Sequence, residues 1–137
     1  MPYQKKLDFN SLETGFEFPS SAYRIDPDLV AKYIQAVEET SDLFAGTNLV
    51  PPSAVAAYAQ AALLEHIDLL PGTIHVSQDL EFLGEVRVGD EVTSRARVSR
   101  KQERGKMRIL NIELEVMDTN NNTLMKGKNS FILPDAD

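Results

Sequence analysis

The sequence predicts an α+β domain in which a long, curved antiparallel sheet wraps around one central, alanine-rich helix. Residues 52–66 form the predicted helix, and six alanines between positions 54 and 62 give it a strong helix propensity. No charged residue occurs from position 50 to position 64, which indicates a helix enclosed by the domain rather than one on its surface. After residue 72 the chain changes to alternating apolar and polar residues, which is typical of strands.

Both ends of the central helix carry recognisable signals. Pro51 and Pro52 suit its start, because proline has no N–H to satisfy and its φ angle is already helical. The Leu-Pro-Gly sequence at residues 70–72 predicts that the helix has ended. At roughly 15–17 residues the helix is about 25 Å long, which is short for a membrane span of about 20 apolar residues.

The N-terminal third is predicted to contain a first strand and an amphipathic helix. Residues 7–25 are expected to form an entry segment and the first strand. Within them residues 15–18 alternate, and Pro19 limits that stretch to a sheet edge or an irregular strand. Asp26, Pro27 and Asp28 form a typical helix start, and the helix is expected to run to about Thr40. Its apolar positions fall on one face: Leu29, Val30, Tyr33, Ile34 and Val37.

The second half of the chain is predicted to form four strands joined by turns. Several of them reach ten or more residues, above the usual five or six. Turns at 103–106 and 118–122 contain Gly and Asn, which accept turn conformations, so we expect an antiparallel meander. The strands cover residues 73–83, 91–101, 107–118 and 124–133.

Length and composition restrict the class of protein. The 137 residues suit one domain, and the absence of cysteine excludes disulfides and thiolate metal sites. We expect a cytoplasmic protein, because the N-terminus lacks the apolar run of a signal peptide. The net charge of −7 argues against nucleic-acid binding. Residues 87–137 nevertheless carry 10 basic and 8 acidic side chains, so a small phosphate-bearing ligand could bind there.

Six short motifs follow one another along nearly the whole chain: residues 9–15, residues 26–28, the Pro51-Pro52-Ser53 helix start, and residues 72–82, 88–92 and 126–134. In this order they resemble the MaoC-like hydratase/dehydratase family of hot-dog proteins. The proline pair and the histidine at the next strand resemble its dehydratase N-terminal (FAS1-like dehydratase) branch. The resemblance implies one hot-dog domain over residues 1–137, with residues 52–66 inside the sheet. The alternative is a cystatin-like cone, in which the helix would be amphipathic.

One part of the chain departs from the family pattern. Active hydratases of the family carry an Asp-x-Asn-Pro-x-His loop before the central helix, and its Asp and His act on the water or the substrate hydroxyl. Ser41 and Asp42 stand where this loop begins, but residues 43–48 contain no Asn-Pro-x-His. In the FAS1-like branch this loss is usual, and such a domain commonly pairs with a catalytic sister domain.

His75 and Asp42 are the catalytic candidates. His75 begins the strand after the central helix, at the expected mouth of a dimer groove, and imidazole titrates near neutral pH; a structural histidine is the alternative. Asp42 is either a remnant of the catalytic loop or a capping carboxylate. His66 lies at the end of the central helix, where a cation complements the helix dipole, so a structural role is expected for it. Glu65 is either the carboxylate that a hot-dog thioesterase would use or a surface residue.

The predicted substrate-binding residues form two groups. In hot-dog enzymes backbone N–H groups near the start of the central helix polarise the thioester carbonyl. Asn48, Ser53 and Ala54 lie there and Tyr58 follows one turn later; helix capping is the alternative role for Asn48 and Ser53. A basic set could hold the phosphates of a coenzyme A or carrier-protein arm, or else form a solvated strand face; it contains Arg95, Arg97, Arg100, Lys101, Arg104, Lys106 and Arg108.

Three functions stay open at this point. The first is a protein of fatty acid metabolism that binds acyl-CoA or acyl carrier protein and hydrates enoyl thioesters reversibly. The second is a non-catalytic partner subunit, and the third is a thioesterase that uses Glu65 or Asp42. We expect no cofactor apart from the coenzyme A or phosphopantetheine of the substrate, and no metal. A homodimer or a heterodimer with a catalytic hot-dog subunit is expected, because a single unit leaves a sheet edge unpaired.

Overall fold

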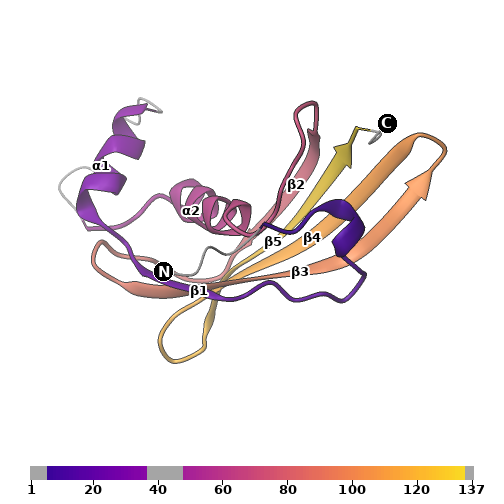
Figure 1. The fold of residues 1–137 in the computed structure, drawn as a ribbon. Helices are drawn as coiled ribbons and strands as arrows, with labels where there is room; N and C mark the ends of the chain where they lie inside the picture. The colour runs from indigo at the N-terminus through magenta and orange to yellow at the C-terminus, as the bar shows by residue number, and fades with distance from the viewer. Residues whose placement is uncertain (1–5, 37–47, 135–137) are drawn as a thin grey trace.

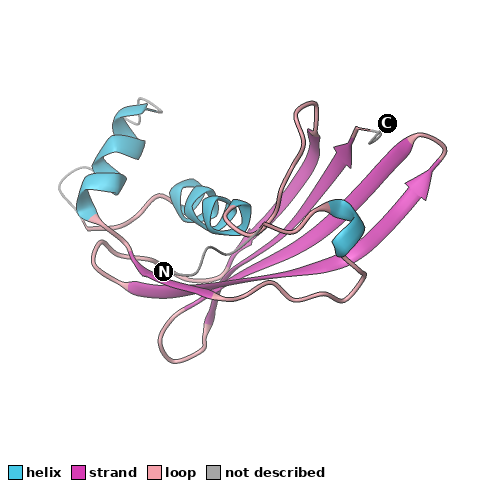
Figure 2. Cartoon of the chain, in the orientation of Figure 1, coloured by secondary structure: helices cyan, strands magenta, loops and turns pink. Residues whose placement is uncertain are grey.

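The computed structural model describes residues 6–36 and 48–134, which form one antiparallel sheet of five strands and two α-helices. Helix α2 (Pro52–Leu64) lies across the concave face of the curved sheet, as Figures 1 and 2 show. Helix α1 (Pro27–Ala36) lies beside it, and a short 3-10 helix, Phe9–Ser11, lies over the far end of the sheet. This arrangement confirms the predicted α+β class.

The strands have the spatial order β1-β3-β4-β5-β2. Strands β3, β4 and β5 form the predicted meander. Strand β2 does not form a hairpin with β3. It is the edge strand opposite β1 and pairs antiparallel with β5, with Ile74 opposite Ile132. The sequence identified β2 correctly but not its neighbour. The bounds are β1 Ser21–Arg24, β2 Ile74–Phe82, β3 Glu91–Arg104, β4 Met107–Met117 and β5 Thr123–Leu133.

The turns between the long strands follow the predicted chemistry. Gly105, between β3 and β4, has φ of 58°, and Asn121, between β4 and β5, has φ of 64°; glycine and asparagine adopt this left-handed region most readily. The Asp118 carboxylate accepts hydrogen bonds from the backbone N–H groups of Asn120 and Asn122. Hydrogen bonds from Asn122 lower the pKa of Asp118 below its usual 3.8, because they stabilise the charged form.

The first strand lies in the last part of residues 7–25, the segment in which it is predicted. Residues 15–18 make only a single isolated bridge, Glu17 with Arg97, while β1 begins at Ser21. Both segments run along the same edge of β3, since the Phe18 N–H donates to the Ala96 carbonyl at 3.0 Å. Pro19 separates them, because it has no N–H to donate to the sheet.

Both helices begin where the sequence predicts. The Asp26 carboxylate accepts the N–H of Asp28 at 2.7 Å and so caps α1. Helix α2 begins at Pro52 and ends at Leu64, two residues before the predicted end. The predicted last turn of α1, with Val37 and Thr40, lies outside the described residues. Within the described residues, neither helix is long and apolar enough to cross a membrane.

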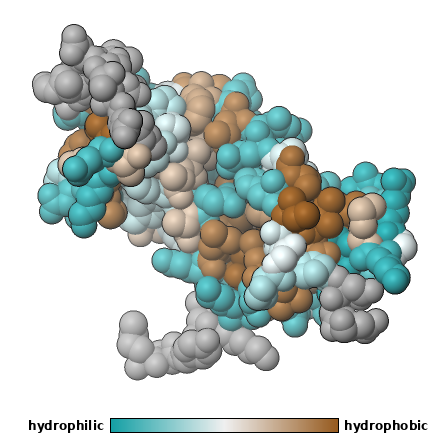
Figure 3. Space-filling view, turned by 90° about the horizontal axis from the view of Figure 1, so that it is seen from above, coloured by the Kyte–Doolittle hydropathy of each residue, from teal (hydrophilic) through white to brown (hydrophobic). Residues whose placement is uncertain are grey.

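The hydrophobic core lies between α2 and the concave face of the sheet. Helix α2 contributes Ala54, Val55, Ala56, Ala59 and Leu63. The opposite stripe of the same helix is exposed in the single chain: Pro52, Ser53, Ala57, Ala61 and Leu64. The sheet therefore covers one side of the predicted central helix, and the other side is open in a single chain. Figure 3 shows the molecule from above relative to Figure 1, which is the side on which α2 lies, and brown apolar surface is visible there.

Candidate functional site

His75 lies on β2 at the helix side of the sheet, where it contacts two residues of β5. Its ring stacks on the buried Phe131 ring, with centroids 4.7 Å apart and planes 24° apart. Its Nε2 atom lies 3.2 Å from Oδ1 of Asn129. The Asn129 Nδ2 group in turn donates to Oε1 of Gln60 on α2 at 3.0 Å. A polar network of His75, Asn129 and Gln60 therefore joins the edge strand to the central helix.

Asn129 is the buried member of this network, with 1% of its surface exposed. Burial of an amide is costly unless both its oxygen and its nitrogen have partners, and here His75 and Gln60 supply them. Asn129 is not among the site residues predicted from the sequence. A signal was present, because the inward positions of its strand are otherwise apolar: Met125, Gly127, Phe131 and Leu133.

A second polar cluster lies on the other flank of α2, toward α1 and β1. The Tyr33 hydroxyl donates to the Ser53 Oγ atom at 2.7 Å, which ties α1 to the start of α2. The Tyr58 hydroxyl is buried without a hydrogen-bond partner among the described residues. Burial, followed by the charges of Tyr33, Asp26 and Tyr23, raises the pKa of Tyr58. Ala54, the neighbour of Ser53, is fully buried.

Asn48 has a structural contact of its own. Its Oδ1 atom accepts a hydrogen bond from the Arg87 guanidinium at 2.6 Å, and its carbonyl accepts the Val88 N–H at 2.7 Å. Asn48 thus fixes the segment before α2 to the loop between β2 and β3. Asp42 lies outside the described residues.

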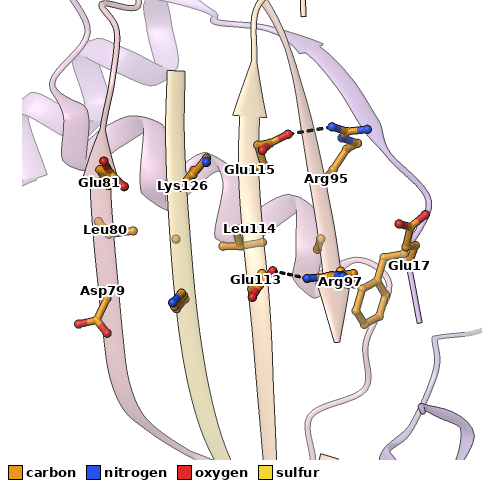
Figure 4. A pocket seen from close by; sticks show the side chains of 14 residues that line it. Glu17, Asp79, Leu80, Glu81, Arg95, Arg97, Glu113, Leu114, Glu115 and Lys126 are labelled. Carbon is orange, nitrogen blue, oxygen red and sulfur yellow. Dashed lines mark hydrogen bonds and ion pairs between the residues drawn. The ribbon is translucent and has the colours of Figure 1, made fainter. Parts of the chain in front are cut away.

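Arg95 and Arg97 lie on the face of the sheet that is turned away from α2, apart from the other predicted residues. Their neighbours Ser94, Ala96 and Val98 are buried, and side chains alternate between the faces of a strand. Arg95 binds Glu115 at 2.8 Å and Arg97 binds Glu113 at 2.7 Å, as Figure 4 shows.

These two ion pairs belong to a larger pattern that the sequence analysis does not predict. Acidic and basic side chains alternate from strand to strand across this outer face. They surround a hollow of about 760 Å³. We call the two sets the charge rows: Asp79, Lys128, Glu113 and Arg97 in one, and Glu81, Lys126, Glu115 and Arg95 in the other.

The rest of the basic set is divided between structural contacts and the β3–β4 hairpin. Two cations contact the ring of Phe9, with Lys101 Nζ at 4.6 Å and Arg108 Cζ at 4.5 Å from its centroid. Arg108 also donates to Oδ1 of Asn10 at 2.7 Å. These contacts hold the N-terminal segment on the sheet.

The remaining candidates lie at the end of α2. Glu65 is the exposed C-cap residue of α2. His66 has its Nε2 atom 3.5 Å from the Ser21 hydroxyl. Among residues 6–36 and 48–134, no three His, Asp or Glu side chains come together as a metal site would require.

The comparisons with known proteins concern the fold and the family. Residues 13–127 match the model of a family described as FAS1-like, dehydratase domain region. The (R)-hydratase of A. caviae involved in PHA biosynthesis has 24% sequence identity and a TM-score of 0.73, over 90% of this chain and 98% of that one. The MaoC-like dehydratase of Rhodospirillum rubrum has 16% identity and a TM-score of 0.73, over 96% and 99%.

A third similar structure is a complex. It is the C-terminally truncated HadBC (3R-hydroxyacyl-ACP dehydratase) of Mycobacterium tuberculosis, with 19% identity and a TM-score of 0.64, over 87% of this chain and 96% of that one. No curated protein sequence gives a significant match. At these identities the structural likeness shows the fold, which is the predicted hot-dog fold.

Proposed function

This chain belongs to the family of the FAS1-like dehydratase domain region, and from that premise we propose that it binds an acyl thioester of coenzyme A or of an acyl carrier protein. The reaction class we propose is reversible hydration of the enoyl thioester to the 3-hydroxyacyl thioester. The observation that supports it most is the oriented imidazole of His75, which Asn129 links to Gln60 on the central helix of a hot-dog fold.

His75 would move the proton in this reaction. Adding water to an enoyl thioester requires a group that takes a proton from the water and one that delivers a proton to the carbon next to the carbonyl. An imidazole suits both tasks near neutral pH. No described residue hydrogen-bonds the Nδ1 atom of His75, so this nitrogen is available to a ligand.

Of the backbone N–H groups at the start of α2 that were predicted as oxyanion donors, only that of Ser53 is free to act in the described part of the chain. Pro51 and Pro52 have no N–H, and the Ala54 N–H already donates to the Pro51 carbonyl at 2.9 Å. The N–H of Ser53 has no acceptor among the described residues. Ser53 and Gln60 are seven residues apart on α2, which at 1.5 Å per residue is about 10 Å.

This separation favours a second function, that of a non-catalytic partner subunit. Asn129 links His75 to Gln60, and Gln60 lies about 10 Å along α2 from Ser53, whereas the carbon and the oxygen of the reaction belong to one thioester group. Within one chain this spacing argues against Ser53 as the oxyanion donor for a substrate on which His75 acts, so hydration by this protein would use another donor. In the partner function this chain would shape the acyl-binding groove of a catalytic hot-dog subunit.

Crotonyl-CoA hydration distinguishes these functions. We expect the purified protein to hydrate crotonyl-CoA, and His75→Ala to lower kcat by about 100-fold or more, the usual range for loss of a general base. His66→Ala, which removes the other histidine of the chain, is the matched control and should keep the wild-type rate. The rate follows from the loss of enoyl-thioester absorbance.

The other outcomes are equally clear. A wild-type protein that binds acyl-CoA in calorimetry but does not hydrate it would support the partner function. Equal loss of activity in both histidine variants would exclude a special role for His75. A protein that neither binds nor hydrates acyl-CoA would contradict the proposed function.

We also propose that a second hot-dog subunit, a copy or a relative, pairs along β2. Strand β2 has no neighbour on its outer side within the described sheet. Its apolar side chains are exposed, at 58% for Ile74, 48% for Val76 and 42% for Phe82. An unpaired apolar edge strand and the bare stripe of α2 are both typical of surfaces that a partner covers.

Light scattering tests the self-pairing directly. A homodimer has about twice the 15.3 kDa mass of the chain, and Val76→Asp should convert it to a monomer because it places a charge in the paired edge. Leu29→Asp is the matched control, since Leu29 is exposed to a similar extent on α1. A wild-type protein that stays at 15.3 kDa would exclude the homodimer and leave the heterodimer.

A further inference from the structure

We propose that Asn129 and Gln60 are positioning residues that hold neutral His75 as its Nε2–H tautomer and so leave Nδ1 as the proton acceptor. This inference deepens the proposed function and names the atom of His75 that would receive the proton. It depends on three side chains from β2, β5 and α2, which are far apart in the sequence.

The directions of the two hydrogen bonds of Asn129 determine the tautomer of His75. An amide side chain has one accepting end, its oxygen, and one donating end, its nitrogen. Nδ2 of Asn129 donates to Oε1 of Gln60 at 3.0 Å, so Oδ1 is the end that faces His75 at 3.2 Å. An oxygen in that place requires a donor. Nε2 of His75 must therefore carry the proton, and in the neutral ring Nδ1 then holds the lone pair.

Two further contacts keep the ring in place. The Phe131 ring lies against the imidazole at 4.7 Å between centroids and is itself buried, so it limits rotation of the imidazole about its side-chain bonds. Asn129 is buried in the same core and cannot move aside without loss of its own partners. With the ring plane and one nitrogen fixed, the direction of Nδ1 is fixed as well.

The choice of an amide has a chemical consequence. A carboxylate at position 129 would also orient the ring, but its charge would stabilise the imidazolium, so that less of the ring would be in the neutral form that accepts a proton. A neutral asparagine fixes the tautomer without adding a charge. Asn129 thus does what a carboxylate often does for a functional histidine, which is to orient the ring through a hydrogen bond, but it does so without a negative charge.

Gln60 allows the direction of the network to be reversed by substitution. Gln60→Glu can only accept, so it keeps Nδ2 of Asn129 turned toward the helix and should preserve the Nε2–H tautomer. Gln60→Lys can only donate, so it should turn Oδ1 toward the helix and Nδ2 toward His75. His75 must then accept at Nε2 and carry its proton on Nδ1. Gln60 is partly exposed, so either charge can reach water.

Nitrogen-15 NMR of the histidine ring reads the tautomer without any need for activity. We expect a larger Nε2–H fraction in the wild type than in the urea-unfolded chain, the same in Gln60→Glu, and a shift to Nδ1–H in Gln60→Lys. Ala61→Glu and Ala61→Lys place the same charges on the next, exposed residue and should change nothing. Nδ1–H in the wild type, or no response to Gln60→Lys, would overturn the inference.

Kinetics separates this inference from the proposed function. If the wild type hydrates crotonyl-CoA, Gln60→Lys should lower kcat about tenfold or more with little change in KM, because it removes the base and not the binding site. A Gln60→Lys variant with reversed tautomer and unchanged kcat would overturn the role of Nδ1. If the wild type has no activity, the proposed reaction fails, while the NMR result still decides the tautomer.

Discussion

Replacement of Ala59 by glutamate is expected to unfold most of the protein. Ala59 lies in the middle of α2 with 1% of its surface exposed. The space that it lines together with Ala96 and Leu114 has a volume of only about 10 Å³, the limit for one water molecule. A glutamate side chain does not fit in this space, and transfer of its carboxylate from water into the core costs several kcal/mol. That is a large part of the 5–15 kcal/mol that stabilises a typical domain.

The matched control for this substitution lies two residues further along the same helix. Ala61 is exposed, so Ala61→Glu adds the same side chain to the same helix with little change in burial, and we expect its free energy of unfolding to stay within about 1 kcal/mol of the wild type. Urea unfolding followed by circular dichroism measures both variants. Equal stability of the two variants would show that α2 does not pack on the sheet through Ala59.

The truncation Ile112→Ala is expected to lower the free energy of unfolding by about 2–5 kcal/mol, the range for a cavity left by a large apolar side chain. Ile112 is fully buried in β4 and lies between Val98 of β3 and Asn129 of β5. It is central to the sheet, so the surrounding side chains cannot close the cavity without shifts in three strands.

Ile109 on the same strand provides the control. It is only partly buried, and Ile109→Ala removes the same atoms with less apolar surface lost from the core. We expect it to cost about 1 kcal/mol. Thermal or urea unfolding gives both values. If Ile109→Ala were the more destabilising variant, the assignment of the inner and outer faces of β4 would be wrong.

Local patterns predicted the elements of this fold well. The alternation from Val92 to Val98 identified β3 and its inward face, and the turn residues Gly105 and Asn121 marked both hairpins. These features depend on neighbours in the sequence, where side-chain periodicity and turn conformations act. The place of β2 depends on which distant strand it pairs with, and its own alternation contains no information about that.

In the candidate site, too, the features that depend on sequence neighbours were predicted and those that depend on strand pairing were not. His75 was predicted from its position after the central helix, but its partners Asn129 and Gln60 come from other elements and follow from the register of β2 against β5. Arg95 and Arg97 alternate correctly along β3. Their glutamate partners lie on β4, and only the pairing of the two strands brings them together. Composition alone could not distinguish a phosphate-binding set from a row of ion pairs.

The position of β2 beside β5 also affects how the sheet is assembled during synthesis. Strand β2 ends at Phe82, whereas its partner β5 ends at Leu133, so about 50 further residues must be made before the pairing is complete. At roughly 5–20 residues per second this takes about 3–10 s. During that interval β3 and β4 can pair locally, whereas β2, with its apolar residues Ile74 and Phe82, has no strand to pair with. A nascent chain therefore exposes an apolar, unpaired strand, which leaves β2 open to chaperones and to aggregation.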